Sequence, residues 1–247
     1  YLLFGFITQI YTKYLIYRSK KFLKKYSNSK IYKNNKINDP ISILCEKYGS
    51  DKGGLNNFSD KRKSHFYASY YHDLFKSKKE KINLVLECGI GTTDEKIPAN
   101  MTRYGKPGAS LRVFREYFKN AKIYGADIDK NILFNNSRIQ SYYVDQLSTK
   151  SINKMWSEIN KDIFDIIIDD GMHDFNASLN FFKISFTKLK KGGFYIIEDV
   201  NVSYLLELAK KLEKFNPMIV FTNNKNNIDD YLFIIKKFWL LLICYFV

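Results

Sequence analysis

The stretch Leu84-Val-Leu-Glu87-Cys-Gly89-Ile-Gly91 has the pattern of a buried strand that runs into a tight glycine turn, with an acid near its end. Three later segments repeat this design of an apolar run ending in acid: Ile123–Asp129, Phe164–Asp170 and Gly192–Asp199. In an open parallel sheet, ligands bind outside the carboxyl ends of the strands. The four segments therefore predict one crevice, with a nucleoside-type cofactor at one end and a metal ion at the other.

Strand and helix patterns alternate through the rest of the chain. Strands are expected at 83–88, 122–127, 141–145, 164–169 and 193–198. Helices are expected at 41–48, 65–75, 109–119, 150–159, 176–189 and 202–214. Alternation at this spacing implies right-handed crossovers and a doubly wound, mostly parallel sheet, so the expected fold class is α/β. Two late strands, 217–222 and 231–236, are joined by a polar turn and predict an antiparallel hairpin at the sheet edge.

Length and cysteine content favour one domain in a reducing compartment. A chain of 247 residues with 45% hydrophobic content can bury one good core. Its three cysteines, Cys45, Cys88 and Cys244, are scattered and form no CxxC pair. This pattern argues against a disulfide framework and against a zinc–thiolate site, and we expect a cytoplasmic protein.

The formal net charge of +15 is concentrated in the N-terminal third. Residues 1–81 hold 18 lysines and arginines against 6 acids. A basic, aromatic-rich arm can bind anionic lipid, nucleic acid or an acidic glycan. The alternative is compositional, because lysine, asparagine and isoleucine are abundant throughout, as in chains from AT-rich genomes. No segment matches an RNA-recognition motif, so no nucleic-acid partner is expected.

Both ends of the chain are apolar, but neither predicts a membrane span. The helical stretch 1–28 is interrupted by polar residues and then becomes rich in lysine. It either lies on a membrane surface, with its lysines toward anionic headgroups, or packs on the domain. We expect a basic amphipathic arm and linker at 1–40, a main domain at 41–237 and an apolar tail at 238–247.

The glycine turn indicates a cofactor that has no pyrophosphate. Glycine at 89 and 91 lets the backbone approach a ligand closely. A dinucleotide site needs a third glycine that opens into a helix, whereas Thr92-Thr-Asp94 lead into a loop. Asp127 ends the second strand and is placed to accept hydrogen bonds from a ribose diol. Asp145 ends the third strand and can meet an adenine amino group, although acids at strand ends are also common helix caps.

Asp170, Glu198 and Asp199 place three carboxylates at the ends of adjacent strands. Hard oxygen ligands suit Mg²⁺, which keeps positions open for waters and substrate oxygens. A hydroxyl bound to the ion loses its proton more readily, and His173 is placed nearby as the general base. The alternative is that Asp170 belongs, with Asp174, to the cap of the following helix.

Several motifs follow one another along residues 45–236: Tyr48-Gly-Ser-Asp51-Lys52, His65-x-Tyr67-x-x-x-Tyr71, Glu87-Cys-Gly89-Ile-Gly91, Gly108-Ala-Ser110-Leu-Arg112, Asp127-Ile-Asp129, Asp145-Gln146, Asp169-Asp170-Gly-Met-His173 and Glu198-Asp199. Together they resemble the class I S-adenosylmethionine-dependent methyltransferases. Within that class, the similarity is to metal-dependent sugar O-methyltransferases of macrolide deoxysugars and of capsule or surface-polysaccharide clusters. The glycine turn is generic, and the Gly-Ala-Ser-Leu-Arg, Asp-Asp-Gly-Met-His and Glu-Asp motifs are the specific ones.

The resemblance implies a cofactor site and a catalytic site. Nine residues would bind S-adenosylmethionine, the first two along its methionine and ribose parts: Glu87, Gly89, Gly91, Ser110, Arg112, Asp127, Asp145, Gln146 and Asp169. Within this set, Ser110 and Arg112 would close over the cofactor, Asp127 would hold the ribose, and Asp145 and Gln146 would sit near the adenine.

The same resemblance makes Asp170, Glu198 and Asp199 ligands of Mg²⁺ and places His173 and Asp170 at the catalytic centre. The aromatic segment 65–71 would then cover the active site, whereas the alternative is that its rings simply pack in the core.

The expected function is methyl transfer from S-adenosylmethionine to a hydroxyl of a sugar or of a glycan or capsule precursor. The long loop 92–107 departs from the macrolide pattern and leaves the acceptor open, with a capsule phosphoramidate and a lipid-linked intermediate as alternatives. A different class of function is a non-catalytic, membrane-tethered binding module. The expected partner is a small-molecule or glycan acceptor, while peripheral membrane contact through the arm and a homo-oligomer are left open.

Overall fold

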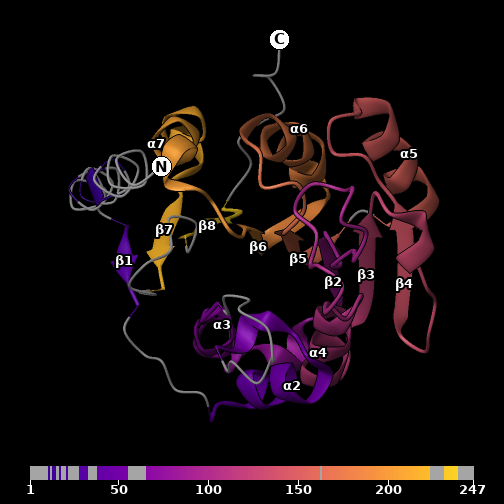
Figure 1. Cartoon of the computed structure of the whole chain (residues 1–247). Helices are drawn as coiled ribbons and strands as arrows, with labels where there is room; N and C mark the ends of the chain where they lie inside the picture. Colours follow the sequence, from indigo (N-terminus) through magenta and orange to yellow (C-terminus); the bar gives the residue numbers. More distant parts are fainter. Residues whose placement is uncertain are drawn as a thin grey trace, which may run out of the picture.

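Eight strands form one sheet in the order β1-β7-β8-β6-β5-β2-β3-β4, with helices on both faces (Figure 1). The computed structural model of the chain describes residues 28–32, 38–54, 65–161, 163–222 and 231–238, together with five single residues before them: Tyr11, Lys13, Tyr14, Tyr17 and Lys21. The expected arm at 1–28 and the expected apolar tail at 238–247 lie almost entirely outside the described residues.

The strands and helices follow the predicted alternation. The strands are β1 (Lys30–Ile31), β2 (Leu84–Cys88), β3 (Lys122–Asp127), β4 (Ile139–Tyr143), β5 (Phe164–Asp169), β6 (Leu189–Ile197), β7 (Met218–Phe221) and β8 (Tyr231–Lys236). The helices are α2 (Pro40–Tyr48), α3 (Tyr67–Phe75), α4 (Ala109–Tyr117), α5 (Thr149–Ile159), α6 (Phe175–Ser185) and α7 (Val202–Lys211).

The strand pairing confirms the predicted fold class. β2 to β6 pair in parallel, whereas β8 is antiparallel to both β6 and β7, as expected for a closing hairpin. Beyond the hairpin, β1 pairs in parallel with β7 through Lys30 and Ile31. The segment expected to be a linker therefore contributes an outer strand to the sheet.

Alternate residues of the central strands face two separate hydrophobic cores. On β5, Ile167 packs with α5, α6 and α7, whereas Ile166 and Ile168 pack with α2, α3 and α4. Figure 1 shows the same two layers of helices on opposite sides of the sheet. Because β5 is buried on both faces, its residues form the nearly continuous apolar run that a central parallel strand requires.

Several predicted boundaries shift by a few residues. β4 begins and ends two residues earlier than expected, so Asp145 lies beyond the strand in the following turn. The helical patterns expected to run to 189 and 214 end at Ser185 and Lys211, and each continues near its end as a 3₁₀ turn, Phe186–Lys188 and Glu213–Phe215. In the described part of the chain, no helix is long and apolar enough to cross a membrane.

The strand order brings four acidic strand ends to one edge of the sheet. Glu198 follows β6, Asp170 follows β5, Glu87 lies near the end of β2 and Asp127 ends β3. These four strands are consecutive neighbours in the order β6-β5-β2-β3. This is the edge where a parallel sheet binds its ligands.

Candidate active site

A cavity of about 250 Å³ opens at this edge of the sheet. Nine of the predicted site residues line it: Gly89, Gly91, Asp127, Asp145, Gln146, Asp170, His173, Glu198 and Asp199. Among the described residues, four predicted ones lie outside its wall: Glu87, Ser110, Arg112 and Asp169. The 92–107 loop adds an apolar part to the wall through Ile97, Pro98, Ala99 and Met101.

The two glycines of the turn after β2 have different physical reasons to be glycine. Both have left-handed backbone, with φ of 84° at Gly89 and 88° at Gly91. A Cβ atom at Gly89 would lie 2.0 Å from the carbonyl oxygen of Asp170, so this glycine lets the β5 loop pack against the turn. A Cβ atom at Gly91 would meet only the Met101 side chain, at 3.2 Å, so the turn itself is what requires this glycine.

Asp127 and Asp145 are fixed at the cavity wall by backbone groups. Asp127 accepts hydrogen bonds from the N–H of Ile90 on Oδ2, at 2.8 Å, and from the N–H of Asp129 on Oδ1, at 2.9 Å. Burial raises the pKa of Asp127, and the backbone N–H groups offset part of that effect. Asp145 accepts the N–H of Leu147 at 2.9 Å. Each carboxylate therefore has a defined orientation before any ligand binds.

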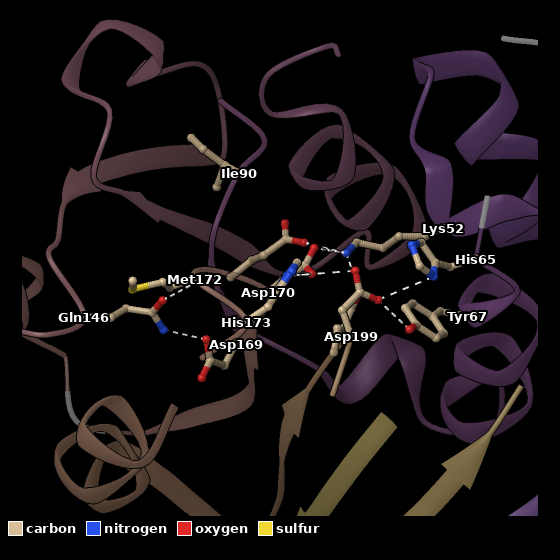
Figure 2. Close-up of polar contacts among 12 residues, drawn as sticks. Lys52, His65, Tyr67, Ile90, Gln146, Asp169, Asp170, Met172, His173 and Asp199 are labelled. Carbon is tan, nitrogen blue, oxygen red and sulfur yellow. Dashed lines mark hydrogen bonds and ion pairs between the residues drawn. The ribbon is translucent and has the colours of Figure 1, made fainter. Parts of the chain in front are cut away.

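Gln146 clamps the loop that follows β5 (Figure 2). Its Nε2 donates to Oδ1 of Asp169 at 2.5 Å, and its Oε1 accepts the N–H of Met172 at 2.7 Å. Asp169 itself is buried behind the cavity, and its Oδ2 accepts no hydrogen bond from the described residues. Burial raises the pKa of Asp169 to about 6. The Gln146–Asp169 pair therefore positions the loop that carries Asp170 and His173.

Glu87, Ser110 and Arg112 support the site from behind its wall. Ser110 Oγ donates to Oε2 of the fully buried Glu87 at 2.5 Å. Arg112 donates to the carbonyl of Pro107 at 2.8 Å, and its guanidinium lies over the Phe134 ring, 4.7 Å from the centroid. Arg112 thus holds the end of the 92–107 loop. The direct cofactor contacts expected of these three residues stay predictions.

His173, Asp170 and Asp199 meet at the carboxyl ends of β5 and β6. Nε2 of His173 lies 3.2 Å from Asp170 Oδ1 and 3.9 Å from Asp199 Oδ2. Burial opposes protonation of His173, but the hydrogen bond to Asp170 and the charge of Asp199 raise its pKa to about 9. His173 and Asp199 also have left-handed φ angles, 54° and 50°. Such conformations are costly for side chains other than glycine and cluster at functional sites.

Lys52 is a central residue of the site to which the sequence analysis assigned no role. Its Nζ lies 2.5 Å from Asp170 Oδ2, 2.6 Å from Glu198 Oε2 and 3.3 Å from Glu87 Oε1 (Figure 2 shows the contact with Asp170). Tyr71 Oη donates to the other oxygen of Glu198 at 2.6 Å. Both Glu198 oxygens are therefore engaged. The available signal was the Tyr48-Gly-Ser-Asp51-Lys52 motif within the family resemblance.

One buried ammonium group contacts two buried carboxyl groups, Glu87 and Glu198, and the half-buried Asp170. Burial opposes the charge of Lys52, but its acidic neighbours hold its pKa well above the usual range. Burial raises the pKa of Glu87 to about 7 and that of Glu198 to about 8. Burial would also raise the pKa of Asp170, but Lys52 and His173 together lower it to about 2. Lys52 is therefore charged, and Asp170 is its ionised partner.

The aromatic segment 65–71 contributes both to the hydrophobic core and to the active site. Tyr67 and Tyr71 are fully buried, and Tyr67 Oη donates to Asp199 Oδ1 at 2.5 Å. His65 stacks on Tyr67 with ring centroids 5.0 Å apart, and its Nδ1 lies 3.4 Å from the same Asp199 oxygen (Figure 2). The rings therefore pack in the core while their polar atoms orient the acids of the site.

The helix after the β5 loop is capped by Asp174, and Asp170 takes no part in the cap. The Asp174 side chain accepts the N–H groups of Asn176 and Ala177 at 2.9 and 3.0 Å. Asp170 instead contacts Lys52 and His173. The capping alternative for Asp170 is therefore wrong.

Two sets of donor atoms have the spacing of a cation site. Within each set the ligand atoms lie within 4.8 Å of one another, and the sets are Asp170, His173 and Asp199, and Glu87, Asp170 and Glu198. The ammonium of Lys52 already contacts all three acids of the second set. The first set faces the cavity and offers carboxylate oxygens of the kind that Mg²⁺ prefers. Asp170 and Asp199 thus fit the predicted ion, and the role of Glu198 as a third ligand stays a prediction.

Comparison with known proteins finds relatives among O-methyltransferases. The chain is 30% identical over 164 residues to the 8-demethyl-8-alpha-L-rhamnosyl tetracenomycin-C 2'-O-methyltransferase of Streptomyces olivaceus. The match covers 66% of this chain and 38% of that protein. It is 31% identical over 168 residues to the mycinamicin VI 2''-O-methyltransferase of Micromonospora griseorubida, with 66% and 37% covered. The chain thus spans less than half the length of these curated relatives. No family model matches it.

The fold is also shared with a solved structure, the MycE methyltransferase from the mycinamycin biosynthetic pathway in complex with Mg, SAH and mycinamycin VI. The TM-score is 0.60 at 22% identity, and the match covers 81% of this chain and 54% of that one. The chain therefore shares the fold of this methyltransferase. The predicted resemblance of the chain to sugar O-methyltransferases is confirmed by the relatives that it matches.

Proposed function

We propose that this chain transfers a methyl group from S-adenosylmethionine to a hydroxyl of a sugar or glycan precursor. One observation carries the proposal. A single continuous cavity has Asp127 and Asp145 in its wall, as a nucleoside needs, and also His173 between Asp170 and Asp199, as deprotonation of a hydroxyl needs. The O-methyltransferase names of the matched relatives support the same reaction.

The cofactor half of the proposal rests on pre-oriented groups. When bound, S-adenosylmethionine supplies the methyl group on its sulfonium, and Mg²⁺ supplies a positive charge that acidifies the acceptor hydroxyl. Asp127 suits a ribose diol because backbone N–H groups already fix its carboxylate at the cavity wall. Asp145, fixed by the N–H of Leu147, suits the adenine amino group. The carboxylates of Asp170 and Asp199 would hold the ion.

His173 accepts the proton of the hydroxyl at Nε2 in this proposal. That nitrogen faces Asp170 and Asp199, so the positive charge that it gains is stabilised by two carboxylates. The same two carboxylates hold the pKa of His173 at about 9, above the range that suits a base at neutral pH. Positive charge at Asp170 and Asp199 lowers that pKa, so a cation there and a neutral His173 belong together.

The acceptor approaches along the apolar wall formed by the 92–107 loop. Ile97, Pro98 and Met101 line the cavity from this loop. An apolar wall beside polar catalytic groups suits a ring that has a hydrophobic face and a hydroxyl-bearing edge, as a deoxysugar has. The relatives are named for a rhamnosyl tetracenomycin and for mycinamicin VI, which makes deoxysugar glycosides the first acceptors to test.

The decisive experiment is calorimetric titration of the full chain with S-adenosylhomocysteine, first with Mg²⁺ and then with EDTA. This reaction product is stable, and its binding needs no acceptor. We expect micromolar binding under both conditions, followed by transfer of labelled methyl groups to members of a deoxysugar glycoside panel only when Mg²⁺ is present. Folded protein that binds no S-adenosylhomocysteine would contradict the proposal and favour the non-catalytic binding module.

A further inference from the structure

Lys52 lies at the centre of an acidic cluster and itself has no part in the proposed reaction. It comes from a 3₁₀ turn, Asp51–Gly53, and its side chain reaches acids at the ends of three neighbouring strands. Lys52 is only 5% exposed. Lysine is almost never buried to this extent unless its charge is paired, so the acids and the ammonium group form one unit.

The three acids around Lys52 have the arrangement of a cation site. Oxygens of Glu87, Asp170 and Glu198 lie within 4.8 Å of one another, and the ammonium nitrogen is 2.5 to 3.3 Å from one oxygen of each. Glu87 is fully buried, and its Oε1 pairs with the ammonium nitrogen at 3.3 Å, a longer contact than those of Asp170 and Glu198.

Asp170 is shared between this inner cluster and the outer one. Its Oδ2 contacts Lys52, whereas its Oδ1 contacts His173. The inner position therefore lies on one side of the Asp170 carboxylate, and the outer position, between Asp170 and Asp199, lies on the other. Two divalent ions on either side of one carboxylate would repel each other, whereas one ammonium group and one divalent ion would repel each other less.

We propose that Lys52 is a tethered cation that fills the inner of two adjacent cation positions and thereby confines a divalent ion to the outer one. It is a positioning residue, because it acts through Glu87, Asp170 and Glu198. The outer ion rests on the proposed function, whereas the inner position rests on geometry alone. Without the ammonium, the three inner carboxylates become a divalent site of their own.

The test compares the parent chain with Lys52→Met, which keeps most of the length of the side chain and removes its charge, and with Lys52→Arg, which keeps the charge. Mn²⁺ is the probe, because free and bound Mn²⁺ can be counted by electron paramagnetic resonance. We expect Lys52→Met to bind one more Mn²⁺ per chain than the parent protein. We also expect Mn²⁺ to raise the melting temperature of Lys52→Met more than that of the parent or of Lys52→Arg. These readouts do not involve turnover.

A second variant keeps the test decisive if Lys52→Met folds poorly. Lys52→Met with Glu198→Gln removes one inner charge and should bind no more Mn²⁺ than the parent protein. Lys52→Met that unfolds without Mn²⁺ but refolds with it supports the proposal. The proposal would be overturned if Lys52→Met bound the same number of Mn²⁺ ions as the parent chain. It would also be overturned if Mn²⁺ failed to refold an unfolded Lys52→Met, or if the double variant still bound the extra ion. A parent chain that binds no Mn²⁺ while Lys52→Met binds one would instead remove the outer metal from the proposed function and leave the tethered cation standing.

Discussion

His173 combines a left-handed backbone, a polar contact with Asp170 and an opening to the cavity. The backbone conformation points the imidazole back toward the strand ends, where two carboxylates meet it. Those carboxylates favour the protonated ring, which cannot accept a proton. The chemistry at this residue therefore depends on what neutralises its acidic neighbours.

This argument predicts the pH dependence of turnover. Only the neutral imidazole is a base, and its pKa is raised to about 9, so kcat/KM should increase as pH rises from about 6 toward that value. Saturating Mg²⁺ should move the inflection to lower pH, because it offsets the charges of Asp170 and Asp199. Initial rates measured with labelled S-adenosylmethionine test this dependence.

The matched variant for that prediction is His173→Ala. We expect turnover to fall by roughly 10²- to 10⁴-fold, the usual contribution of a general base, with the pH inflection gone. S-adenosylhomocysteine should bind it as it binds the parent chain. Parallel loss of binding and turnover would mean that His173 holds the structure of the loop instead.

Asp169 predicts a pH effect on stability. Its pKa is raised to about 6 from 3.8 by burial, so the folded state binds this proton more tightly than the unfolded state does. Burial of this carboxyl group therefore costs no stability below pH 3.8, and the free energy of unfolding falls as pH rises from there through about 6. Asp169→Asn keeps an acceptor for Gln146 and should therefore stabilise the fold at neutral pH, by at most roughly 3 kcal/mol. Urea denaturation at several pH values measures it.

Asp165 on the same strand provides the opposite control. Its carboxylate accepts the N–H groups of Asn83 and Leu84 at 2.8 and 2.9 Å and pairs with Lys190. Asp165→Asn should therefore destabilise the fold at neutral pH. If Asp169→Asn destabilised it equally, the burial of Asp169 would not be the dominant effect at that position.

Among the strands and helices, the sequence predicted the elements that a local residue pattern specifies, and it missed contacts between segments far apart in the chain. The run Phe164–Asp169 is apolar because it is buried on both faces, so its pattern alone identified a central strand and put an acid at its end. Lys52 contacts residues 118 and 146 positions away, a distance over which no local pattern operates. β1 was missed for the same reason, because only its pairing with β7 makes two residues a strand.

The turn after β2 packs directly against the β5 loop, and this contact predicts the effect of a substitution at Gly89. Gly89→Ala would put a Cβ atom 2.0 Å from the backbone of the β5 loop, so the two elements would have to separate. Gly192 is the matched control, since its φ of 79° is also left-handed and a Cβ atom there meets nothing within 4 Å. We expect Gly89→Ala to cost at least about 2 kcal/mol more than Gly192→Ala in urea denaturation. Equal costs would show that the backbone angle, and not the packing of the β5 loop, requires glycine at 89.

At the scale of the whole molecule, the site draws on both the sheet and the segment before it. The carboxyl ends of β2, β3, β5 and β6 supply acids, while Lys52 and Tyr71 reach them from the 3₁₀ turn after α2 and from α3, on the layer of helices below the sheet in Figure 1. The described wall of the cavity begins at Asp51 along the chain. We propose that the basic arm that precedes it contacts membranes.

Residues 1–28 contain six lysines and arginines and no acid. Each such residue near an anionic surface contributes about 1 kcal/mol, and the contribution is screened by salt. We expect the full chain to sediment with phosphatidylserine vesicles at low salt, and a chain that begins at residue 29 to stay in the supernatant. S-adenosylhomocysteine should bind both chains equally. Replacing Lys20, Lys21, Lys24 and Lys25 by glutamine should release the full chain while leaving its length intact, and phosphatidylcholine vesicles should bind none of the three. Equal sedimentation of the shortened and full chains with phosphatidylserine would assign the contact to another surface.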